Sequence, residues 1–353
     1  MIIVTGSLGL IGFTACKFFL KKGFKVIGID NDIRKYFFGI HASNNWKRKK
    51  LIENKSYHHL NIDIRNFNKI DYLFKKNKGK VKAIIHTAAQ PSHDWAAKEP
   101  LTDFHINASG TLNLLEAFKE HCRDASFIFT STNKVYGDNP NFLPIQEKLN
   151  RFEIKTNHKY FKKGIDEKLS IDNTTHSIFG VSKTSADLLV QEYGRYFNLK
   201  TVCFRGGCLT GESHSGAELH GFLSYLVKSI ILENKYTIFG HKGKQVRDNI
   251  HSLDVVSAFY EFIKKPKIGG KIYNLGGGRA NSCSILEAIK IIENLSGKKA
   301  NYKIINKSRL GDHVWWITDN SKFKKDYPMW KIKIPLVKSL ERMIDNQLKK
   351  INI

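Results

Sequence analysis

Three glycines near the start of the chain have the spacing of a phosphate-binding turn. Residues 1–5 (MIIVT) predict a short buried strand, and Gly6, Gly9 and Gly12 follow it directly before an apolar helical stretch, FTACKFFLKKG. In such a turn the first glycine permits a tight bend, the second lets the backbone approach a pyrophosphate, and the third lets the helix pack against the strand. The N–H groups at the positive end of the helix dipole then hold the phosphates.

An acidic residue at the end of the next strand extends this pattern. The strand KVIGID ends on Asp30, eighteen residues after Gly12. An acid at that place binds a ribose diol and repels a 2′-phosphate, so the pattern favours NAD over NADP. The alternative is an ordinary turn between strand and helix, followed by a strand that ends on a polar residue. The two features together favour a dinucleotide-binding site.

Strand and helix patterns alternate through the first two hundred residues. Further strands are expected at HHLNIDI, which ends near Asp63, and at 83–89 (AIIHTAA), 126–132 (SFIFTST) and 200–207 (KTVCFRGG), with helical patterns such as 110–120 and 181–196 between them. This alternation predicts an α/β fold, namely a doubly wound parallel (Rossmann) sheet with right-handed crossovers. Ligands then bind beyond the carboxyl ends of the strands.

The length of the chain predicts two lobes, because 353 residues exceed one typical domain. We expect a dinucleotide-binding domain over 1–207, to which 250–276 returns, and a smaller α/β substrate lobe over 208–353. The polar stretch 139–176 is too long for an ordinary connection and is interpreted as an irregular, functional flap.

The net charge is +26. Nucleic acid or an anionic surface is one explanation, but the lysines are scattered, and the densest cluster, 47–50 (KRKK), is short. The charge therefore indicates a lysine-rich surface that attracts a doubly negative small substrate, with no specific nucleic-acid partner.

The cysteines and the hydropathy bear on location. The five cysteines show neither CxxC nor metal-ligand spacing, so we expect free thiols in a reducing compartment and no metal site. The first strand begins at Met1, so no cleavable leader is expected. No apolar run approaches the roughly 18 residues of a membrane span. These features predict a cytoplasmic protein.

Several motifs together resemble those of a known family. With TGSLGLIG, Asp63-Ile64, HTAAQ (86–90), STNKVYGD (131–138) and Lys183, nearly the whole chain resembles the extended short-chain dehydrogenase/reductases that modify sugar nucleotides. Within them, STNKVYGD, GTLNLLEA and GKQVRD (243–248) are most similar to the CDP-paratose (CDP-tyvelose) 2-epimerases.

The resemblance implies an NAD-dependent epimerase that inverts C2 of a nucleotide-diphosphate sugar through transient oxidation to a keto sugar. It also implies a homo-oligomer formed through helices such as 110–120 and 181–196. The alternatives are a dehydratase, a reductase, an epimerase at another carbon, or a non-catalytic protein that binds NAD or a sugar nucleotide.

The resemblance also implies roles for individual residues. The implied cofactor-binding residues are Gly6, Gly9, Leu10, Ile11, Gly12, Asp30, Asp63, Ile64, Ala88, Ala89 and Lys183. The implied substrate-binding residues are Gln90, Thr132, Asn133, Arg247 and Arg309. Thr132 would bond the reacting sugar oxygen, and the charge of Lys183 would lower the pKa of a neighbouring base. The alternatives are a strand threonine and a solvated helix lysine.

One position departs from the family pattern. The family places Tyr-x-x-x-Lys on one helix face, whereas this chain has Phe179 four residues before Lys183. Phenylalanine carries no proton, so a working enzyme needs another base. His93 is our candidate, because an imidazole is a base near neutral pH; its alternative is a histidine bonded to backbone. The other candidates are Tyr136, Tyr160 and Lys134.

The second lobe offers ligands for phosphate. Arg247 and Arg309 match family positions that clamp the pyrophosphate of a sugar nucleotide, for which the planar guanidinium is suited. Each arginine has an alternative role in a surface ion pair with Asp248 or Asp312. Trp315 and Trp316 are interpreted as core residues.

Overall fold

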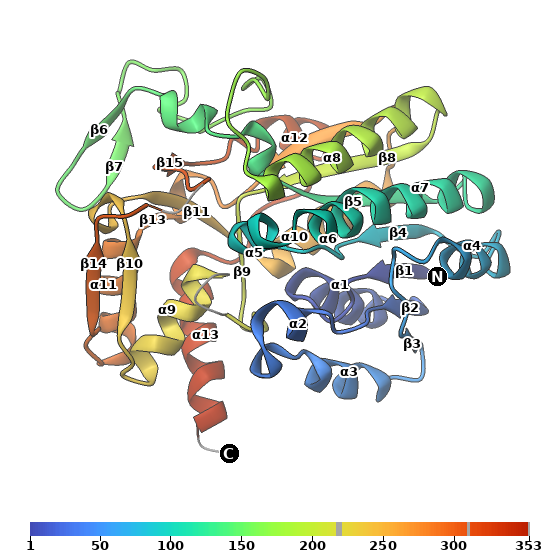
Figure 1. The fold of residues 1–353 in the computed structure, drawn as a ribbon, viewed down its shortest axis with the longest axis horizontal. Coiled ribbons are helices and arrows are strands. Elements are labelled where there is room, and N and C mark those ends of the chain that lie inside the picture. Colours follow the sequence, from blue (N-terminus) through green and yellow to red (C-terminus); the bar gives the residue numbers. More distant parts are fainter. Residues whose placement is uncertain (217–220, 309–310, 352–353) are drawn as a thin grey trace. The chain divides into compact units, whose positions relative to one another are not determined.

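The computed structural model describes residues 1–216, 221–308 and 311–351, which form two compact units (Figure 1). Unit 1 comprises residues 1–135, 177–205 and 255–273, and unit 2 comprises the described residues of 136–176, 206–254 and 274–353. Part of the stretch 250–276 therefore belongs to unit 1. Residues 136–176 belong to unit 2, although our expected boundaries placed them in the first domain.

A seven-stranded sheet forms the centre of unit 1, in the order β12-β8-β5-β4-β1-β2-β3. Its strands are β1 (Ile2–Thr5), β2 (Val26–Ile29), β3 (Tyr57–Leu60), β4 (Ala83–His86), β5 (Ser126–Thr132), β8 (Lys200–Gly206) and β12 (Lys271–Leu275). The pairs β1–β2, β2–β3, β1–β4 and β4–β5 are parallel. The predicted doubly wound α/β sheet is thus confirmed.

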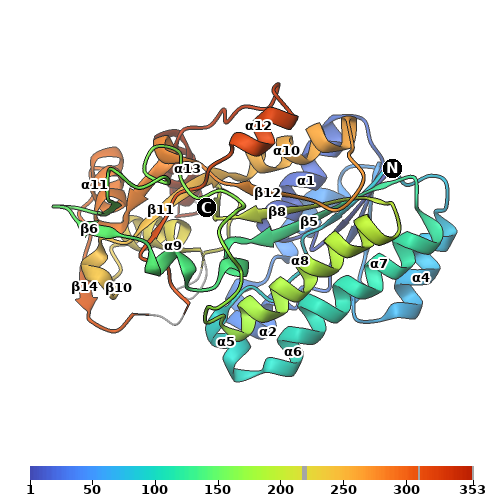
Figure 2. The same ribbon diagram turned by 90° about the horizontal axis from the view of Figure 1, so that it is seen from above.

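Helices cover both faces of this sheet. They are α1 (Leu10–Lys21), α2 (Arg34–Phe38), α3 (Asn45–Ile52), α4 (Phe67–Lys76), α5 (His93–Lys98), α6 (Pro100–Phe104), α7 (Gly110–His121), α8 (Ile178–Tyr196) and α10 (Ser252–Lys264). Helices α4, α7 and α8 lie side by side on one face, and α1 and α10 lie on the other (Figure 2). Leu114, Leu115 and Phe118 of α7 are fully buried at the spacing of one helix face, which is why α7 packs on the sheet.

Unit 2 consists of smaller sheets and helices. Its strands are β6 (Ile145–Glu147), β7 (Phe152–Ile154), β9 (Cys208–Thr210), β10 (Tyr236–Phe239), β11 (Val246–His251), β13 (Ser282–Ser284), β14 (Tyr302–Ile305) and β15 (Trp315–Trp316). Its helices are α9 (Phe222–Ile231), α11 (Ile285–Ser296), α12 (Ser321–Asp326) and α13 (Leu336–Ile351). Strands β9, β13 and β15 all pair with β11, and α9, α11 and α13 share one apolar core.

The stretch 139–176 is more regular than predicted. Strands β6 and β7 pair in antiparallel register, with Ile145 opposite Ile154. The prediction of an irregular flap is therefore wrong for 145–154. The two strands are very short and the residues between them are charged or turn-forming, so the sequence shows no strand pattern there. No helix among the described residues is long and apolar enough to cross a membrane.

Candidate cofactor and catalytic site

The glycine turn between β1 and α1 is constrained by backbone contacts. Gly6 has a φ of +66°, in the left-handed region, and a Cβ atom there would lie 2.6 Å from the amide nitrogen of Ala88. A Cβ atom at Gly12 would lie 2.1 Å from the carbonyl oxygen of Gly6. The first and third glycines are therefore required by the protein itself, since no side chain fits.

Gly9 differs from its two neighbours in the motif. Its φ of −66° and ψ of 174° suit any residue, and, apart from the adjacent residues of the chain, the described atom nearest an added Cβ would be the Gly6 oxygen, at 3.2 Å. The surface above Gly9 is thus clear of protein atoms. A glycine at such a place is explained by a ligand that approaches the backbone closely.

The start of α1 offers backbone N–H donors. Gly9 is its N-cap, and within the described residues no side chain caps the helix and no acidic residue occupies its first turn. The N–H groups of the first turn, which include those of Leu10 and Ile11, have no partner within a helix. Together with the helix dipole, they suit a pyrophosphate.

Asp30 follows β2 and is bound to the backbone around it. Its Oδ2 accepts a hydrogen bond from the N–H of Leu8 (2.9 Å), and its Oδ1 accepts one from the N–H of Asp32 (2.8 Å). Burial raises the pKa of the carboxyl, and these two hydrogen bonds and the charge of Lys47 partly offset this effect. A carboxylate oxygen accepts two hydrogen bonds, so Asp30 can also accept from ribose hydroxyls.

The two residues expected beside the adenine lie after β3. Asp63 pairs with Arg65 (2.7 Å) and accepts a hydrogen bond from Asn31 (3.1 Å). Burial would raise the pKa of Asp63, but the hydrogen bonds and charge of Arg65 outweigh it and lower the pKa. Ile64 is buried against Gly110 of α7.

The loop after β4 contains Ala88, Ala89 and Gln90. Ala88 adjoins the glycine turn through its contact with Gly6. Gln90 is fully buried, and its amide group donates to Ser92 and Asp103 and accepts from the N–H of Ser92. The Gln90 side chain therefore shapes the loop that leads to His93.

The end of β5 and the start of α8 bring the expected polar residues of unit 1 into place. Thr132 is the last residue of β5; its Oγ accepts a hydrogen bond from the N–H of Lys134 (3.2 Å) and contacts the buried Asn133. Lys183 is buried beneath β5, where its Nζ donates to the carbonyl of Thr130 (3.1 Å) and lies 4.1 Å from the ring centre of Phe129. Burial lowers the pKa of Lys183 to about 8, against the opposing charge of Asp187.

His93 lies directly beside Phe179, the residue that replaces the family's tyrosine. The ring centres are 4.8 Å apart, although the two residues come from α5 and α8. The Nδ1 atom of His93 is 2.7 Å from the Oγ of Ser177, which also accepts the N–H of Gly180 as the N-cap of α8. The contact with Ser177 therefore holds the imidazole of His93 in place beside Phe179.

Sequence reasoning missed two residues of this site, Ser177 and Asn107. Ser177 holds His93; its signal is a serine at the N-cap of α8, which begins at Ile178 and not at the expected residue 181. Asn107 lies in a π-helical turn, 105–109, and its Nδ2 donates to the carbonyl of Gln90 and to the Oγ of Ser182. π-turns are frequent at functional sites. The helical pattern of the sequence gives no signal that distinguishes such a turn, so Asn107 could not be found from it.

The other candidate bases are poorly suited. Tyr136 is fully buried, and its hydroxyl donates to Asn274 (2.7 Å). Burial raises the pKa of Tyr160 to about 12, which opposes loss of its proton at neutral pH. Lys134 follows Thr132 on a short 3₁₀ turn and is partly buried.

In unit 2, Arg247 lies on β11 and forms an ion pair with Asp312. The alternative role of Arg247 in an ion pair is therefore observed, and the guanidinium remains partly exposed. Arg309 lies outside the described residues. Trp315 and Trp316 are fully buried, as expected of core residues.

The residues of unit 1 fit a bound NAD. The backbone at Gly9 and the N–H donors at the start of α1 suit a pyrophosphate. The carboxylate of Asp30 suits a ribose diol. The carboxylates of Asp30 and Asp32, which lie at that end of β2, disfavour a 2′-phosphate there.

Comparisons with known proteins agree with this geometry. The sequence matches the NAD dependent epimerase/dehydratase family over residues 2–276. CDP-paratose 2-epimerase of Salmonella typhi is 30% identical over 353 residues, covering 98% of each chain. UDP-glucuronate 4-epimerase of Thermodesulfobacterium geofontis is 28% identical and covers 97% of this chain and 94% of its own.

Solved structures show the same fold. UDP-glucuronic acid 4-epimerase from Bacillus cereus in complex with UDP-glucuronic acid and NAD matches with a TM-score of 0.80 at 25% identity, over 99% of both chains. A tyrosine-to-phenylalanine mutant of that enzyme, in complex with UDP-4-deoxy-4-fluoro-glucuronic acid and NAD, matches with a TM-score of 0.79 at 26% identity, also over 99% of both chains. The chain therefore belongs to the NAD-dependent epimerase/dehydratase family and is an enzyme whose cofactor is NAD.

Proposed function

We propose that this enzyme epimerises a nucleotide-diphosphate sugar at C2, on a substrate of the CDP-paratose type. The observation that carries the proposal is the end-to-end similarity to CDP-paratose 2-epimerase, which extends over 98% of both chains and includes unit 2. Similarity confined to the dinucleotide-binding half would support only the cofactor, because related enzymes share that half and differ in their sugar contacts.

The chemistry begins with loss of the proton from the hydroxyl of the reacting carbon. We assign this proton to the imidazole of His93, since Ser177 orients the ring and Phe179 cannot carry a proton. Thr132 holds the reacting oxygen through its hydroxyl. NAD, when bound, supplies the acceptor for the hydride and the donor that returns it to the opposite face of the keto sugar.

Lys183 supports this step by its charge. As an ammonium it binds the ribose of the nicotinamide half, and it lowers the pKa of the neighbouring base. Its place beneath β5 is fixed by the carbonyl of Thr130 and the ring of Phe129. In unit 2, Arg247 binds the diphosphate, and Arg309 is assigned the same role by its family position.

A second candidate is epimerisation of a UDP-sugar at C4. The observation in its favour is that UDP-glucuronate 4-epimerase and UDP-glucose 4-epimerases match 28–30% of the sequence positions over at least 88% of this chain. The replaced tyrosine does not separate the two candidates, because the family pattern places it on α8 in both; the 30% identity to CDP-paratose 2-epimerase over 98% of both chains favours C2.

The test is turnover of defined substrates in D₂O. CDP-paratose, CDP-tyvelose, UDP-glucose and UDP-glucuronic acid are each incubated with the purified protein and followed by NMR. We expect inversion at C2 of a CDP-sugar, without solvent deuterium on carbon. Inversion at C4 of a UDP-sugar would overturn the C2 assignment. Solvent deuterium on a sugar carbon would indicate enolisation and would contradict the return of the hydride from the cofactor.

We also infer that the protein self-associates through α7 and α8. Leu112, Val181, Leu188 and Tyr196 are exposed large apolar residues on these helices, and such side chains on adjacent helices mark an interface. Sedimentation should show an oligomer that Leu188→Glu dissociates. A monomeric wild-type protein would contradict this inference. The cytoplasmic location stays a prediction of the sequence.

A further inference from the structure

Lys47 is a buried lysine beside the glycine turn. It is 1% exposed, although it begins the basic run 47–50 that the sequence analysis interpreted as surface. Its Nζ donates to the carbonyl of Leu8 (3.0 Å), in the middle of the turn. Burying an ammonium is unfavourable unless it is well satisfied, so this place needs an explanation.

The hydrogen bond from Lys47 closes a ring that includes the glycine turn. The N–H of Leu8 donates to Asp30 (2.9 Å), and Asp30 accepts the N–H of Asp32 (2.8 Å). Asp32 accepts the N–H of Asn44 (2.8 Å), whose carbonyl accepts the N–H of Lys47 in the first turn of α3. Both backbone groups of Leu8 are therefore held by side chains that are themselves fixed to each other.

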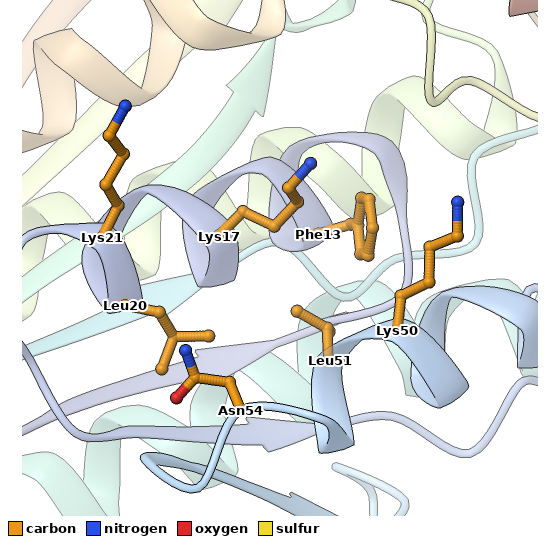
Figure 3. A pocket seen from close by; sticks show the side chains of 7 residues that line it. All are labelled: Phe13, Lys17, Leu20, Lys21, Lys50, Leu51 and Asn54. Carbon is orange, nitrogen blue, oxygen red and sulfur yellow. The ribbon is translucent and has the colours of Figure 1, made fainter.

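Aromatic rings complete the surroundings of the Lys47 ammonium. Its Nζ lies 5.7 Å from the ring centre of Phe13 on α1 and 5.4 Å from that of Trp46 on α3. Lys50, on the same helix, lies 5.2 Å from the Trp46 ring but is exposed. Figure 3 shows Phe13 of α1 and Lys50 of α3 among the side chains that line the pocket between these two helices.

We propose that Lys47 is a positioning residue for NAD: it fixes the carbonyl of Leu8 in the glycine turn, while the N–H of the same residue is held by Asp30, the acceptor for the ribose. The inference rests on the proposed placement of NAD on this turn. Lys47 itself touches neither phosphate nor ribose in this account, and acts through the two groups that do.

Titratable groups from several elements face Asp30. They are Lys47 on α3, Asp32 after β2, Cys16 on α1, and Tyr57 and His59 on β3. Burial raises the pKa of Asp30, the charge of Asp32 raises it further, and the charge of Lys47 lowers it. NAD affinity therefore falls as pH decreases through this pKa, and loss of Lys47 moves that fall to higher pH.

The experiment measures NAD affinity by calorimetry as a function of pH. Lys47→Met should raise the dissociation constant about 10- to 100-fold, as expected when a hydrogen bond from a buried charge is lost, and should move its acid limb to higher pH. The matched control Lys50→Met should leave both unchanged. Lys47→Arg, which keeps the charge, should keep the acid limb of the wild type.

A second variant covers the case in which Lys47→Met does not fold. Asp32→Asn keeps a residue that tolerates the φ of +53° at this position and removes the charge that raises the pKa of Asp30. Its acid limb should move to lower pH, opposite to that of Lys47→Met.

The outcomes separate the two proposals. A wild-type protein that does not bind NAD would overturn the proposed cofactor site. If the wild type binds NAD and Lys47→Met matches Lys50→Met in affinity and pH dependence, only the role of Lys47 fails. An Asp32→Asn variant whose acid limb does not move also overturns it.

Discussion

The glycine turn and the start of α8 belong to one candidate site, but they differ in how closely their residues follow the family pattern. The turn keeps the complete glycine pattern, since a Cβ atom at Gly6 or Gly12 would overlap backbone atoms. The start of α8 keeps Lys183 but has Phe179 where the family has tyrosine, with His93 of another helix packed against it. A site made of backbone has few solutions, whereas a site made of side chains can be rebuilt from a neighbouring element.

The largest effects are expected at the turn. Gly12→Ala should lower the free energy of unfolding by about 3 kcal/mol, because the added methyl group overlaps the Gly6 carbonyl and the backbone must move. It should also abolish NAD binding. Thermal or urea unfolding and calorimetry measure the two effects.

Gly9→Ala is the matched control that separates the effect of the turn on stability from its effect on NAD binding. We expect its stability to stay within about 1 kcal/mol of the wild type, since this backbone suits any residue, while NAD binding is strongly weakened. Equal destabilisation by Gly9→Ala and Gly12→Ala would mean that the space above Gly9 is not kept for a ligand.

The next largest effect tests the proposed role of His93 in place of the family's tyrosine. His93→Ala should lower kcat by about 100- to 10,000-fold, the usual contribution of a general base, with NAD still bound. Adding Phe179→Tyr to this variant places a phenol beside the vacated position and should restore part of the activity. A turnover of His93→Ala equal to the wild type would remove His93 as the base.

Lys183 should impose a pH dependence on the same site. Its lowered pKa of about 8 means that its ammonium is present below pH 8 and lost above it, so kcat/KM should fall as pH rises through about 8. Lys183→Arg should move this limb to higher pH, because guanidinium stays charged. A limb that stays in place in Lys183→Arg would assign it to another group.

The same pKa has a consequence for stability. Between pH 8 and the unfolded value of 10.5, the unfolded chain holds a proton at Lys183 that the folded chain releases. The free energy of unfolding should therefore rise with pH in this window. Lys183→Met should remove this rise.

The smallest effect is expected at Ser177. Ser177→Ala should lower stability by about 1 kcal/mol through loss of the N-cap of α8 and kcat by about tenfold through loss of the bond that orients His93. Ser177→Thr, which keeps the hydroxyl, should recover both. A change in stability without any change in kcat would leave Ser177 with a capping role only.

The parts of this molecule that sequence could predict are those with local signals. The strand, the glycine spacing and Asp30 all lie within thirty residues, and each has a backbone reason that a short pattern expresses. Strand β5, at Ser126–Thr132, was predicted to the residue, because its apolar run ends at turn-forming residues.

The remaining parts depend on contacts between distant elements. The packing of His93 on Phe179 joins positions 86 residues apart, and no pattern on either helix announces it. Lys47 lies in a basic run typical of a solvated surface, and only the packing of α3 on α1 buries it. The pairing of Arg247 with Asp312 is likewise tertiary.

That last ion pair has a consequence for substrate exchange. The Asp312 carboxylate pairs with the guanidinium of Arg247, which is proposed to bind a diphosphate. An incoming ligand thus competes with the Asp312 carboxylate, whose effective concentration is high because it is tethered to the protein. A ligand with one negative charge therefore gains little binding free energy by displacing Asp312, whereas a diphosphate gains more. We expect this competition to weaken binding of the diphosphate and to disfavour ligands with a single negative charge.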